Sequence, residues 1–461
     1  MRKLYLFLLL LIGIVDFSLA GINESVPKVK VKGPKTYMFR IQLKNKVGCG
    51  FTIVDPSKYL SPKAIERRKK QILPVDSTDL PVSQAYIQAV EQLGGKVVSK
   101  SKWNNTLVAE TTERTFGETA GKLPFVEGVK LVWTSLDSVE VATPRPKYHK
   151  ELVLHDTLNA TAYGASEEQL RMLGGQKLHS EGFKGNGMSI AVMDAGFLNA
   201  DLIPALRNIN LVGYADFVVP NSKSIFSEME HGEQVLSVLA VDVPGVYVGA
   251  APEASYWLLR CEDEQSEQPV EEDWWAAAAE FADSVGVDVI NSSLGFHDYD
   301  DLYESYHYWQ QDGETALISH TASMLAKKGI VLVNSCGNDG MSAWKKINFP
   351  ADAKDILAVG AVTSERRNAG FSSLGPTADG RVKPDVMAQG SPTAVVTERG
   401  TISSSVGTSF AAPLITGLVA CLWQKYPQKT ATQIMDMVRL SGDNAKHPDN
   451  VYGYGVPDFG R

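Results

Sequence analysis

The stretch Ser405-Val-Gly-Thr-Ser-Phe-Ala-Ala-Pro413 joins a Gly-Thr turn to a long apolar helical run, from Ala411 to Trp423. The N-terminus of a helix presents unpaired backbone N–H groups and the positive end of the helix dipole. A serine at this position, here Ser409, is expected to be exposed beside ready-made donors for a developing oxyanion. Pro413 falls in the first turn of the expected helix, where its missing N–H costs least. Taken alone, the stretch is a tight turn that caps a buried helix.

Around this stretch, from about residue 166 onward, apolar strands alternate with helices. This alternation is typical of an α/β fold with a mostly parallel sheet and helices on both faces. Ligands of such sheets bind beyond the carboxyl ends of the strands. The pattern predicts strands at 188–193, 211–217, 254–260, 287–291, 330–334 and 355–362, and helices at 232–241, 271–285, 313–328, 411–423 and 432–441.

Residues 35 to about 140 have the pattern of a small α+β domain. This segment contains no set of residues that could form a catalytic site, which favours a binding or packing domain. Residues 136–165 are broken by Pro and Gly and lack apolar periodicity, as is typical of a linker. The small domain is predicted to contain strands at 37–43, 96–103, 105–110 and 129–133 and helices at 61–71, 83–93 and 115–123.

The first twenty residues have the pattern of a secretory signal. Arg2 and Lys3 give a positive start, Leu4 to Val15 is apolar, and Ser18-Leu-Ala20 offers small residues for cleavage after Ala20. An uncleaved membrane anchor is the alternative. Beyond this segment no apolar stretch approaches the ~18 residues that span a bilayer. We therefore expect a secreted or periplasmic protein without a membrane span after signal removal.

Composition sets further bounds on the kind of protein. The chain has 461 residues, room for two or three domains, and a net charge of −8. The mild acidity and the lack of basic runs argue against nucleic acid as a partner. The four cysteines are scattered without a C-x-x-C pair, so they are not a disulfide scaffold. We expect them to be free, with a pairing of two of them left open: Cys49, Cys261, Cys336 and Cys421.

Three polar residues stand out at the ends of the expected elements. Asp194 directly follows the strand at 188–193, His231 opens a helix and precedes Gly232, and Asn338 lies in a glycine-rich turn after the strand at 330–334. Each has an ordinary structural explanation, as a capping, surface or turn residue. A histidine at a helix N-terminus has its charged form disfavoured by the dipole, which suits a proton acceptor.

Together with Ser409, these residue types can perform acyl transfer. A serine hydroxyl is a weak nucleophile and needs a base within hydrogen-bond reach. A histidine can be that base and then the acid, while an aspartate fixes its tautomer and stabilises the imidazolium. An asparagine amide and the serine's own backbone N–H can hold the oxyanion, each donor being worth about 10²–10³ in rate.

The chain order Asp194, His231, Ser409, with Gly-Thr-Ser-Phe-Ala-Ala-Pro at 407–413, resembles the subtilisin-like serine proteases (subtilases, peptidase S8 family). His-Gly at 231–232 and Gly-Asn at 337–338 extend the resemblance, which covers about residues 165–461. It implies that Ser409 is the nucleophile, His231 the general base and acid, and Asp194 its orienting partner. Asn338 would be the oxyanion donor.

The same resemblance implies substrate-binding segments. Ser293-Leu294-Gly295 is similar to the family's segment that pairs with the substrate backbone and walls the first specificity pocket. The segment from Leu259 through Cys261 to Glu262 is similar to the opposite substrate-pairing edge. An extended peptide held in this way is bound by strand addition.

The small domain resembles the propeptide of these proteases, which assists folding and then inhibits until it is cleaved. The chain then divides into a signal peptide at 1–20, a propeptide domain at 21–140, a linker with the processing site at 141–165 and a catalytic domain at 166–461.

Several features depart from the family pattern. Ala195 stands where Ser or Thr is usual, but that hydroxyl takes no part in the chemical step. Glu233 replaces a smaller Thr and is expected to alter the neighbouring substrate pocket. The aromatic and acidic segment 297–312 resembles an insertion, and we expect either a rim of the cleft or a plain surface loop.

Cations have no assigned site in the sequence. The family's calcium-binding loop after the histidine helix is replaced by Asp242-Val-Pro-Gly245, which is short and poor in oxygen ligands. No cofactor is certain, and a structural calcium would lie at an unknown site. The runs Glu262-Asp-Glu264 and Glu271-Glu-Asp273 are candidates for binding cations or basic substrate side chains, but are expected to be solvated acidic surface.

The leading hypothesis is a monomeric, secreted, self-processing serine endopeptidase, with polypeptide substrates and its own propeptide as partners. The alternative is a catalytically inactive homologue that acts as a peptide-binding module. An α/β-hydrolase would have Gly-x-Ser-x-Gly and the order Ser, Asp, His, and a zinc protease would have His-Glu-x-x-His; neither pattern is present.

Overall fold

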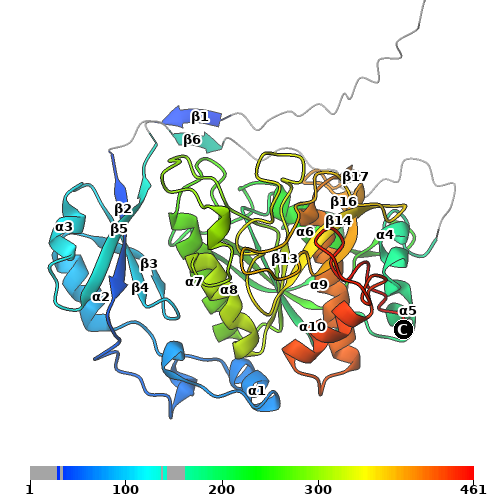
Figure 1. Cartoon of the computed structure of the whole chain (residues 1–461), viewed down its shortest axis with the longest axis horizontal. Helices are drawn as coiled ribbons and strands as arrows, with labels where there is room; N and C mark the ends of the chain where they lie inside the picture. The colour runs from blue at the N-terminus through cyan, green and yellow to red at the C-terminus, as the bar shows by residue number, and fades with distance from the viewer. Residues whose placement is uncertain (1–27, 32–34, 137–138, 143–160) are drawn as a thin grey trace, which may run out of the picture.

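The computed structural model describes residues 28–31, 35–136, 139–142 and 161–461 (Figure 1). The predicted signal peptide and most of the predicted linker lie outside the described residues. Within them, no helix combines the length and the apolar character that crossing a bilayer requires.

A seven-stranded sheet forms the centre of the larger domain, and every neighbouring pair of its strands is parallel. The parallel α/β prediction is therefore confirmed. Its strands are apolar and buried because helices cover both faces. In spatial order they are β15 (Val386–Ser391), β14 (Leu357–Thr363), β13 (Val331–Ser335), β12 (Val289–Ser292), β7 (Ser189–Asp194), β11 (Ser255–Arg260) and β8 (Asn210–Asp216).

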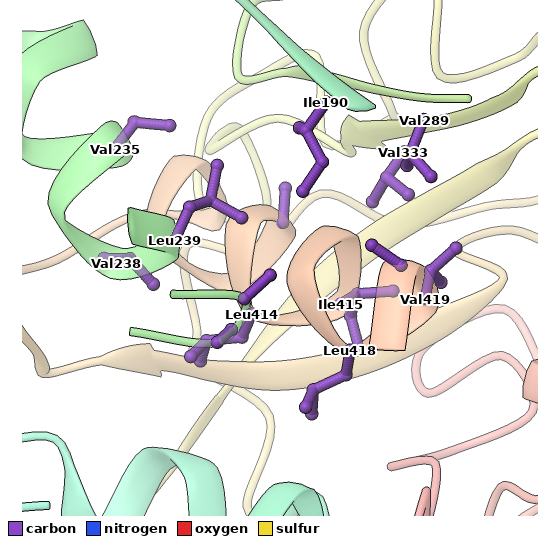
Figure 2. Packing of buried hydrophobic residues seen from close by; sticks show 14 of the residues in the cluster. Ile190, Val235, Val238, Leu239, Val289, Val333, Leu414, Ile415, Leu418 and Val419 are labelled. Atoms are coloured by element: carbon purple, nitrogen blue, oxygen red, sulfur yellow. The ribbon is translucent and has the colours of Figure 1, made fainter. Parts of the chain in front are cut away.

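One face of the sheet is covered by α6 (His231–Ala240) and α9 (Thr408–Lys425), with α10 (Ala431–Leu440) packed against α9. Figure 2 shows how α9 packs: Leu414 lies on the side of α6, near Leu239, and Ile415 and Val419 lie on the side of the sheet residues Val289 and Val333. Burying apolar side chains on both sides of α9 fixes the position of its N-terminus. The opposite face carries α7 (Val270–Val285) and α8 (Leu317–Leu325).

The smaller domain is a four-stranded antiparallel sheet in the order β3 (Lys96–Ser101), β4 (Thr106–Thr111), β2 (Tyr37–Leu43) and β5 (Val126–Thr134). Its own core lies against α2 (Gln84–Gln92) and α3 (Phe116–Ala120). Side chains of its other face, such as Met38 and Val108, join the core formed by α7 and α8. The small domain therefore sits on the α7–α8 side of the larger one (Figure 1).

Shorter elements complete the chain, and most of them carry no clear sequence signal. Only α1 matches a predicted helix, and Ser61 caps it as its sequence indicates. The predicted helix at 313–328 begins only at Leu317, and the four cysteines are free and buried as expected. The remaining elements are β1 (Lys28–Val31), β6 (Val139–Ala142), β9 (Asp242–Val243), β10 (Tyr247–Val248), β16 (Thr393–Val396), β17 (Ile402–Ser405), α1 (Pro62–Lys70), α4 (Glu167–Met172) and α5 (Gly175–Ser180).

Candidate active site

The structure brings Asp194 and His231 together at the carboxyl edge of the sheet. Asp194 is the last residue of β7 and is fully buried, and its Oδ1 lies 2.8 Å from Nδ1 of His231, the first residue of α6. The backbone N–H of Ala195 donates to the same oxygen at 2.9 Å. A Cβ on Gly232 would lie 2.7 Å from the Cβ of Asp194, so only glycine lets the helix start this close. The backbone thus holds the carboxylate in place without the missing hydroxyl at position 195.

The pKa of His231 is shifted upward, whereas its position at a helix N-terminus predicts a downward shift. Burial of the ring lowers its pKa, but the charge of Asp194 and the hydrogen bond to it outweigh burial and raise the pKa above the ordinary 6.5. A full carboxylate charge at 2.8 Å outweighs the partial charge of a helix dipole. The pair therefore favours the imidazolium, the form that a base reaches after it has taken a proton.

Ser409 lies in the first turn of α9 and is largely buried, with 8% of its surface exposed, rather than exposed as the sequence suggests. The turn before it depends on Gly407, whose φ of 154° and ψ of 155° belong to a region that is essentially restricted to glycine. In the described part of the chain Ser409 Oγ makes one hydrogen bond, to the Ser293 carbonyl at 3.2 Å.

Pro413 has a role that the sequence does not reveal. Because α9 begins at Thr408, Pro413 lies in the second turn and not in the first. It has no N–H to donate to the Ser409 carbonyl four residues earlier. The Ser293 hydroxyl donates to that carbonyl instead, at 2.9 Å. Ser293 and Ser409 are therefore joined by two reciprocal hydrogen bonds.

A buried polar chain holds Ser293 in this position. Asn291 at the end of β12 donates from Nδ2 to the Ser293 hydroxyl at 3.0 Å, and Thr416 of α9 donates to Asn291 Oδ1 at 2.8 Å. Sequence reasoning missed Asn291 and Thr416 as positioning residues. The available signal was a polar residue in the buried strand β12 and another in the apolar body of α9.

Asn338 is anchored on the same helix start. Its Oδ1 accepts hydrogen bonds from the backbone N of Thr408 at 2.9 Å and from the Thr408 hydroxyl at 3.1 Å. With the oxygen engaged, the amide nitrogen lies beside Gly407, where an added Cβ would come within 3.7 Å of it. Gly337, with φ of 106°, makes the turn that permits this. Thr408 therefore orients the amide so that its N–H groups face the turn that carries Ser409.

Comparison with known proteins identifies this arrangement. A family model described as the subtilase family matches residues 185–455, and one described as the peptidase S8 propeptide domain of Bacteroidota matches residues 38–149. The chain belongs to the subtilase family. It is a serine-type endopeptidase with a propeptide domain, the organisation of a zymogen protease.

Curated relatives agree with the family assignment. Subtilisin NAT of Bacillus subtilis subsp. natto is 27% identical over 390 residues, 84% of this chain and 88% of the relative. Subtilisin DY of Bacillus licheniformis is 30% identical over 278 residues, 60% of this chain and 90% of the relative. Subtilisin-like protease SBT6.1 of Arabidopsis thaliana is 28% identical over 271 residues but is matched over only 24% of its length.

The two substrate segments expected in this subtilase are both largely buried. Ser293 is 5% and Leu294 4% exposed, and Ser293 is hydrogen-bonded to Ser409. Gly295 packs so closely that a Cβ would lie 2.9 Å from Asn348. Leu259 lies in β11 between β7 and β8, so both edges of its backbone are already paired.

Cys261 is also fully buried, and its N–H donates to the Asp194 carbonyl at 3.0 Å. Leu259 therefore cannot add a substrate strand, and that part of the expectation is wrong. The backbone groups of β11 and the N–H of Cys261 are thus already paired within the sheet.

The acidic run at the start of α7 is buried, so the expectation of a solvated surface is wrong for residues 271–273. Glu272 accepts hydrogen bonds from the hydroxyls of Tyr299 (3.1 Å) and Tyr306 (2.8 Å). Tyr299 is therefore a core residue, while Tyr303 and Trp309 of the same loop are exposed. The loop at 297–312 is anchored by its buried tyrosines and presents only part of its aromatic residues to solvent.

Glu233 of α6, expected to alter a substrate pocket, is fully buried. Neither carboxyl oxygen has a hydrogen-bond partner among the described residues. Burial, with the charges of Glu398 and Glu230 added, raises its pKa well above 4.5. Burial therefore favours the protonated form of this carboxyl, and the side chain is not exposed toward a substrate.

The segment after α6 does not form a calcium loop. Asp242-Val243 and Tyr247-Val248 pair as a tight hairpin with Gly245 at the bend. Asp242 is its single carboxylate, which is too small a ligand set for a cation that takes six to eight oxygens. This donor set does not fit a calcium ion.

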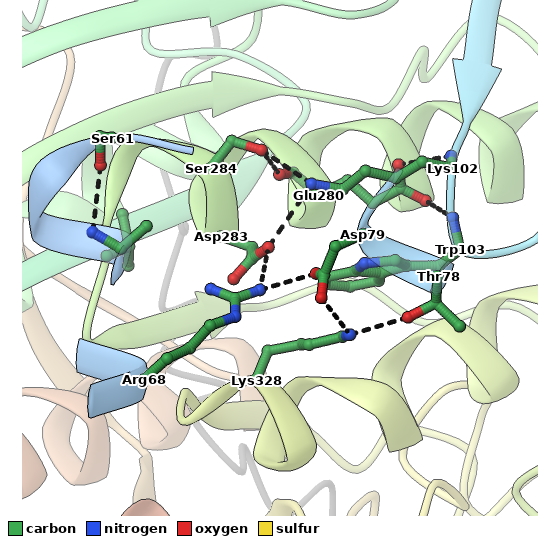
Figure 3. A network of polar contacts seen from close by, with 12 residues as sticks. Ser61, Arg68, Thr78, Asp79, Lys102, Trp103, Glu280, Asp283, Ser284 and Lys328 are labelled. Atoms are coloured by element: carbon green, nitrogen blue, oxygen red, sulfur yellow. Dashed lines mark hydrogen bonds and ion pairs between the residues drawn. The ribbon is translucent and has the colours of Figure 1, made fainter. Parts of the chain in front are cut away.

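The propeptide-like domain is bound to the subtilase domain through buried charges (Figure 3). Arg68 of α1 donates to Asp79 at 2.8 Å and to Asp283 of α7 at 3.0 Å. Lys328 contacts Asp79 at 3.1 Å from the other side. Glu280 of α7 accepts the backbone N–H groups at residues 102 and 103, at 2.7 and 2.9 Å. Each buried charge has partners across the interface, which favours a specific docked orientation.

Proposed function

We propose that this subtilase is a secreted zymogen that cleaves peptide bonds with Ser409 as nucleophile, His231 as base and Asp194 as its orienting partner. The observation that carries the proposal is the 2.8 Å contact between His231 Nδ1 and a fully buried Asp194. That contact leaves Nε2 as the proton acceptor, at the edge of the sheet where α9 presents Ser409.

The proposed reaction has two acyl-transfer steps. Ser409 Oγ attacks the peptide carbonyl carbon as His231 Nε2 takes its proton, and the oxyanion is held by Asn338 Nδ2 and the Ser409 N–H. The imidazolium then protonates the departing amine, and the C–N bond breaks to leave an acyl-enzyme. Water attacks the ester by the same route, and the proton returns to Ser409 as the acid is released.

The propeptide is proposed to fold with the protease domain and to inhibit it until the linker at 141–165 is cleaved. The buried ion pairs of Arg68, Asp79 and Asp283 support a strong intramolecular complex. Export through a signal peptide at 1–20, removal of that peptide and a monomeric product belong to the same proposal.

The test compares the full chain with its Ser409→Ala and Asn338→Ala variants, following chain length and hydrolysis of a protein substrate. The parent is expected to mature and to hydrolyse the substrate, and Ser409→Ala is expected to do neither. Loss of a triad member costs on the order of 10⁴–10⁶ in turnover, a range measured on subtilisin itself. A parent that binds peptides without cleaving them would instead establish the inactive peptide-binding module.

A further inference from the structure

Three glutamates meet where the loop after β11 returns to α7. Glu262, Glu267 and Glu271 each offer a carboxylate oxygen, and these atoms all lie within 4.8 Å of one another. Calcium binds oxygens at 2.3–2.6 Å, so two oxygens on one ion are at most about 5 Å apart. The three side chains are therefore already spaced as ligands of a single ion.

Glu271 supplies an independent indication of a missing partner. It is 1% exposed, and its Oε2 is buried without a hydrogen-bond partner among the described residues. Its Oε1 accepts one long bond, 3.4 Å, from the N–H of Gln268. A buried carboxylate without pairing is expensive. The neighbouring acids of α7 are satisfied, since Glu272 has its tyrosine hydroxyls and Asp273 has Arg40 at 2.6 Å.

No basic side chain in the described part of the chain forms an ion pair with any of the three glutamates. Arg260, at the end of β11, is committed to Asp216, Glu228 and Asp263, at 3.2, 3.7 and 3.9 Å. Asp300 adds negative charge, because its Oδ2 accepts the Glu267 N–H at 3.2 Å. The cluster therefore has no lysine or arginine partner among the described residues. The charges of His231 and His297 act on Glu262 and Glu267, but both histidines pair with nearer carboxylates, those of Asp194, Asp298 and Asp339.

We propose that Glu262, Glu267 and Glu271 bind one Ca²⁺ ion. Three carboxylates offer up to six hard oxygen donors, which suits calcium rather than the metals that prefer nitrogen or sulfur. The ion joins the loop that leaves β11 to the first turn of α7. Because the preceding Cys261 N–H donates to the Asp194 carbonyl, the ion stabilises the strand end next to the proposed triad. Its role is structural and does not depend on the proposed reaction.

The test uses the full chain with Ser409→Ala, so that cleavage cannot confuse the result. Ca²⁺ alone is the probe, and bound ions are counted by equilibrium dialysis after chelator treatment. Glu262→Gln and Glu267→Gln are each expected to bind one ion fewer per chain than the parent. Asp301→Asn, an exposed acid in the adjacent loop, is the matched control and is expected to bind as the parent does.

Thermal unfolding provides a second measurement. In chelator, Glu267→Gln is expected to melt above the parent because it removes repulsion between carboxylates. With Ca²⁺ the order is expected to reverse, since only the parent gains binding energy. The proposal is overturned if the glutamine variants keep the parent's ion count. It is also overturned if Glu267→Gln changes only the preference of the active chain for basic peptides, which would make the cluster a substrate subsite. Neither result bears on whether Ser409 is the nucleophile.

Discussion

At the scale of single residues, Pro413 decides how the proposed nucleophile is held. Its missing N–H leaves the Ser409 carbonyl without the usual helical donor, and Ser293 occupies that acceptor. The Ser293 carbonyl in turn accepts the Ser409 hydroxyl. Because Pro413 removes one backbone hydrogen bond of the helix, the N-terminus of α9 is hydrogen-bonded to Ser293, in the segment after β12. This segment is the proposed wall of the first specificity pocket.

The first prediction concerns the Asp194–His231 pair. Asp194→Asn removes the charge that raises the pKa of His231, so the acid limb of kcat/KM is expected to move to lower pH. The variant is also expected to lose about 10⁴ in kcat, because the tautomer is no longer fixed. The pH profile of both enzymes on one peptide substrate checks this. An acid limb at the same pH in both would contradict the assignment of His231 as the base.

The second prediction concerns stability and Glu233. Its folded pKa lies well above 4.5 because burial disfavours the charge, so the folded state binds more protons than the unfolded chain once the pH exceeds 4.5. Stability is therefore full below pH 4.5 and falls as the pH rises. Glu233→Gln is expected to gain stability over the parent by an amount that grows with pH.

Denaturant unfolding of the Ser409→Ala chain and its Glu233→Gln derivative at pH 4 and pH 8 measures this difference. Glu168→Gln, at an exposed helical position, is the control and is expected to show no such trend. A difference between Glu233→Gln and its parent that stays constant across this range would show that Glu233 is ionised in the folded protein.

At the scale of elements, the N-terminus of α9 organises the site. Gly407 makes the turn, Thr408 orients the Asn338 amide, and Ser409 follows with its N–H at the helix start. The apolar body of α9 is buried against the sheet and α6, so this end has little freedom to shift (Figure 2). The element thus supplies both the proposed nucleophile and the support of its oxyanion donor.

The third prediction tests this support. Thr408→Val removes the hydroxyl that donates to Asn338 Oδ1 but keeps the backbone N–H bond. We expect kcat to fall about tenfold with KM little changed, since an oxyanion donor acts in the transition state. In an Asn338→Ala background, Thr408→Val is expected to lower kcat by a much smaller factor. Equal losses in both backgrounds would show that Thr408 acts only on the general structure of the turn.

At the scale of the whole molecule, the two domains share a core as well as a charged interface. Side chains of the small sheet join those of α7 and α8, and α1 places Arg67 and Arg68 on the carboxyl-terminal half of α7. Both arginines converge on Asp283, which is fully buried. The propeptide-like domain therefore contacts α7 both through apolar side chains in a shared core and through ion pairs with Asp283.

The fourth prediction measures the charged part of this recognition. In the Ser409→Ala full chain, Asp283→Asn leaves the buried Arg67 without a carboxylate and Arg68 with Asp79 alone. The change is expected to cost about 3–5 kcal/mol of unfolding free energy. Lys63→Met breaks the more exposed Lys63–Asp288 pair (3.2 Å) of the same interface and is expected to cost under about 1 kcal/mol. Equal costs from the two changes would contradict a buried network.

The same network predicts behaviour in acid. Burial raises the pKa of Asp283, but Lys102, Arg67 and Arg68 outweigh it and lower the pKa to about 2. Its contribution is therefore full above the ordinary 3.8 and is lost only as the pH falls toward 2. Acid titration of the Ser409→Ala chain and its Asp283→Asn derivative is expected to show the stability difference persisting to pH 4. A difference already lost at pH 5 would contradict this account.

By itself, the sequence determined the parallel α/β sheet, the α+β domain before it and the four residues of the proposed site. Apolar strands that alternate with helices are compatible with few folds other than a parallel α/β sheet. Asp194, His231, Asn338 and Ser409 each lie at or near the end of an element, a position that the local sequence pattern predicts. The same periodicity predicts six strands of the sheet with ends that differ by one or two residues from the observed ones, whereas the seventh strand, β15, was not predicted.

Only the tertiary structure decided which polar groups meet across elements. The Ser293–Ser409 exchange, the burial of Glu233 and Glu271, and the paired edges of Leu259 depend on contacts between residues distant in the chain. The local sequence predicts strands, helices and turns from the spacing of apolar residues and from the turn residues. It does not predict which residue, distant in the chain, will pair with a buried charge. That partner is fixed when the sheet and its helices pack, because a buried polar group is then left with the donors that packing brings to it.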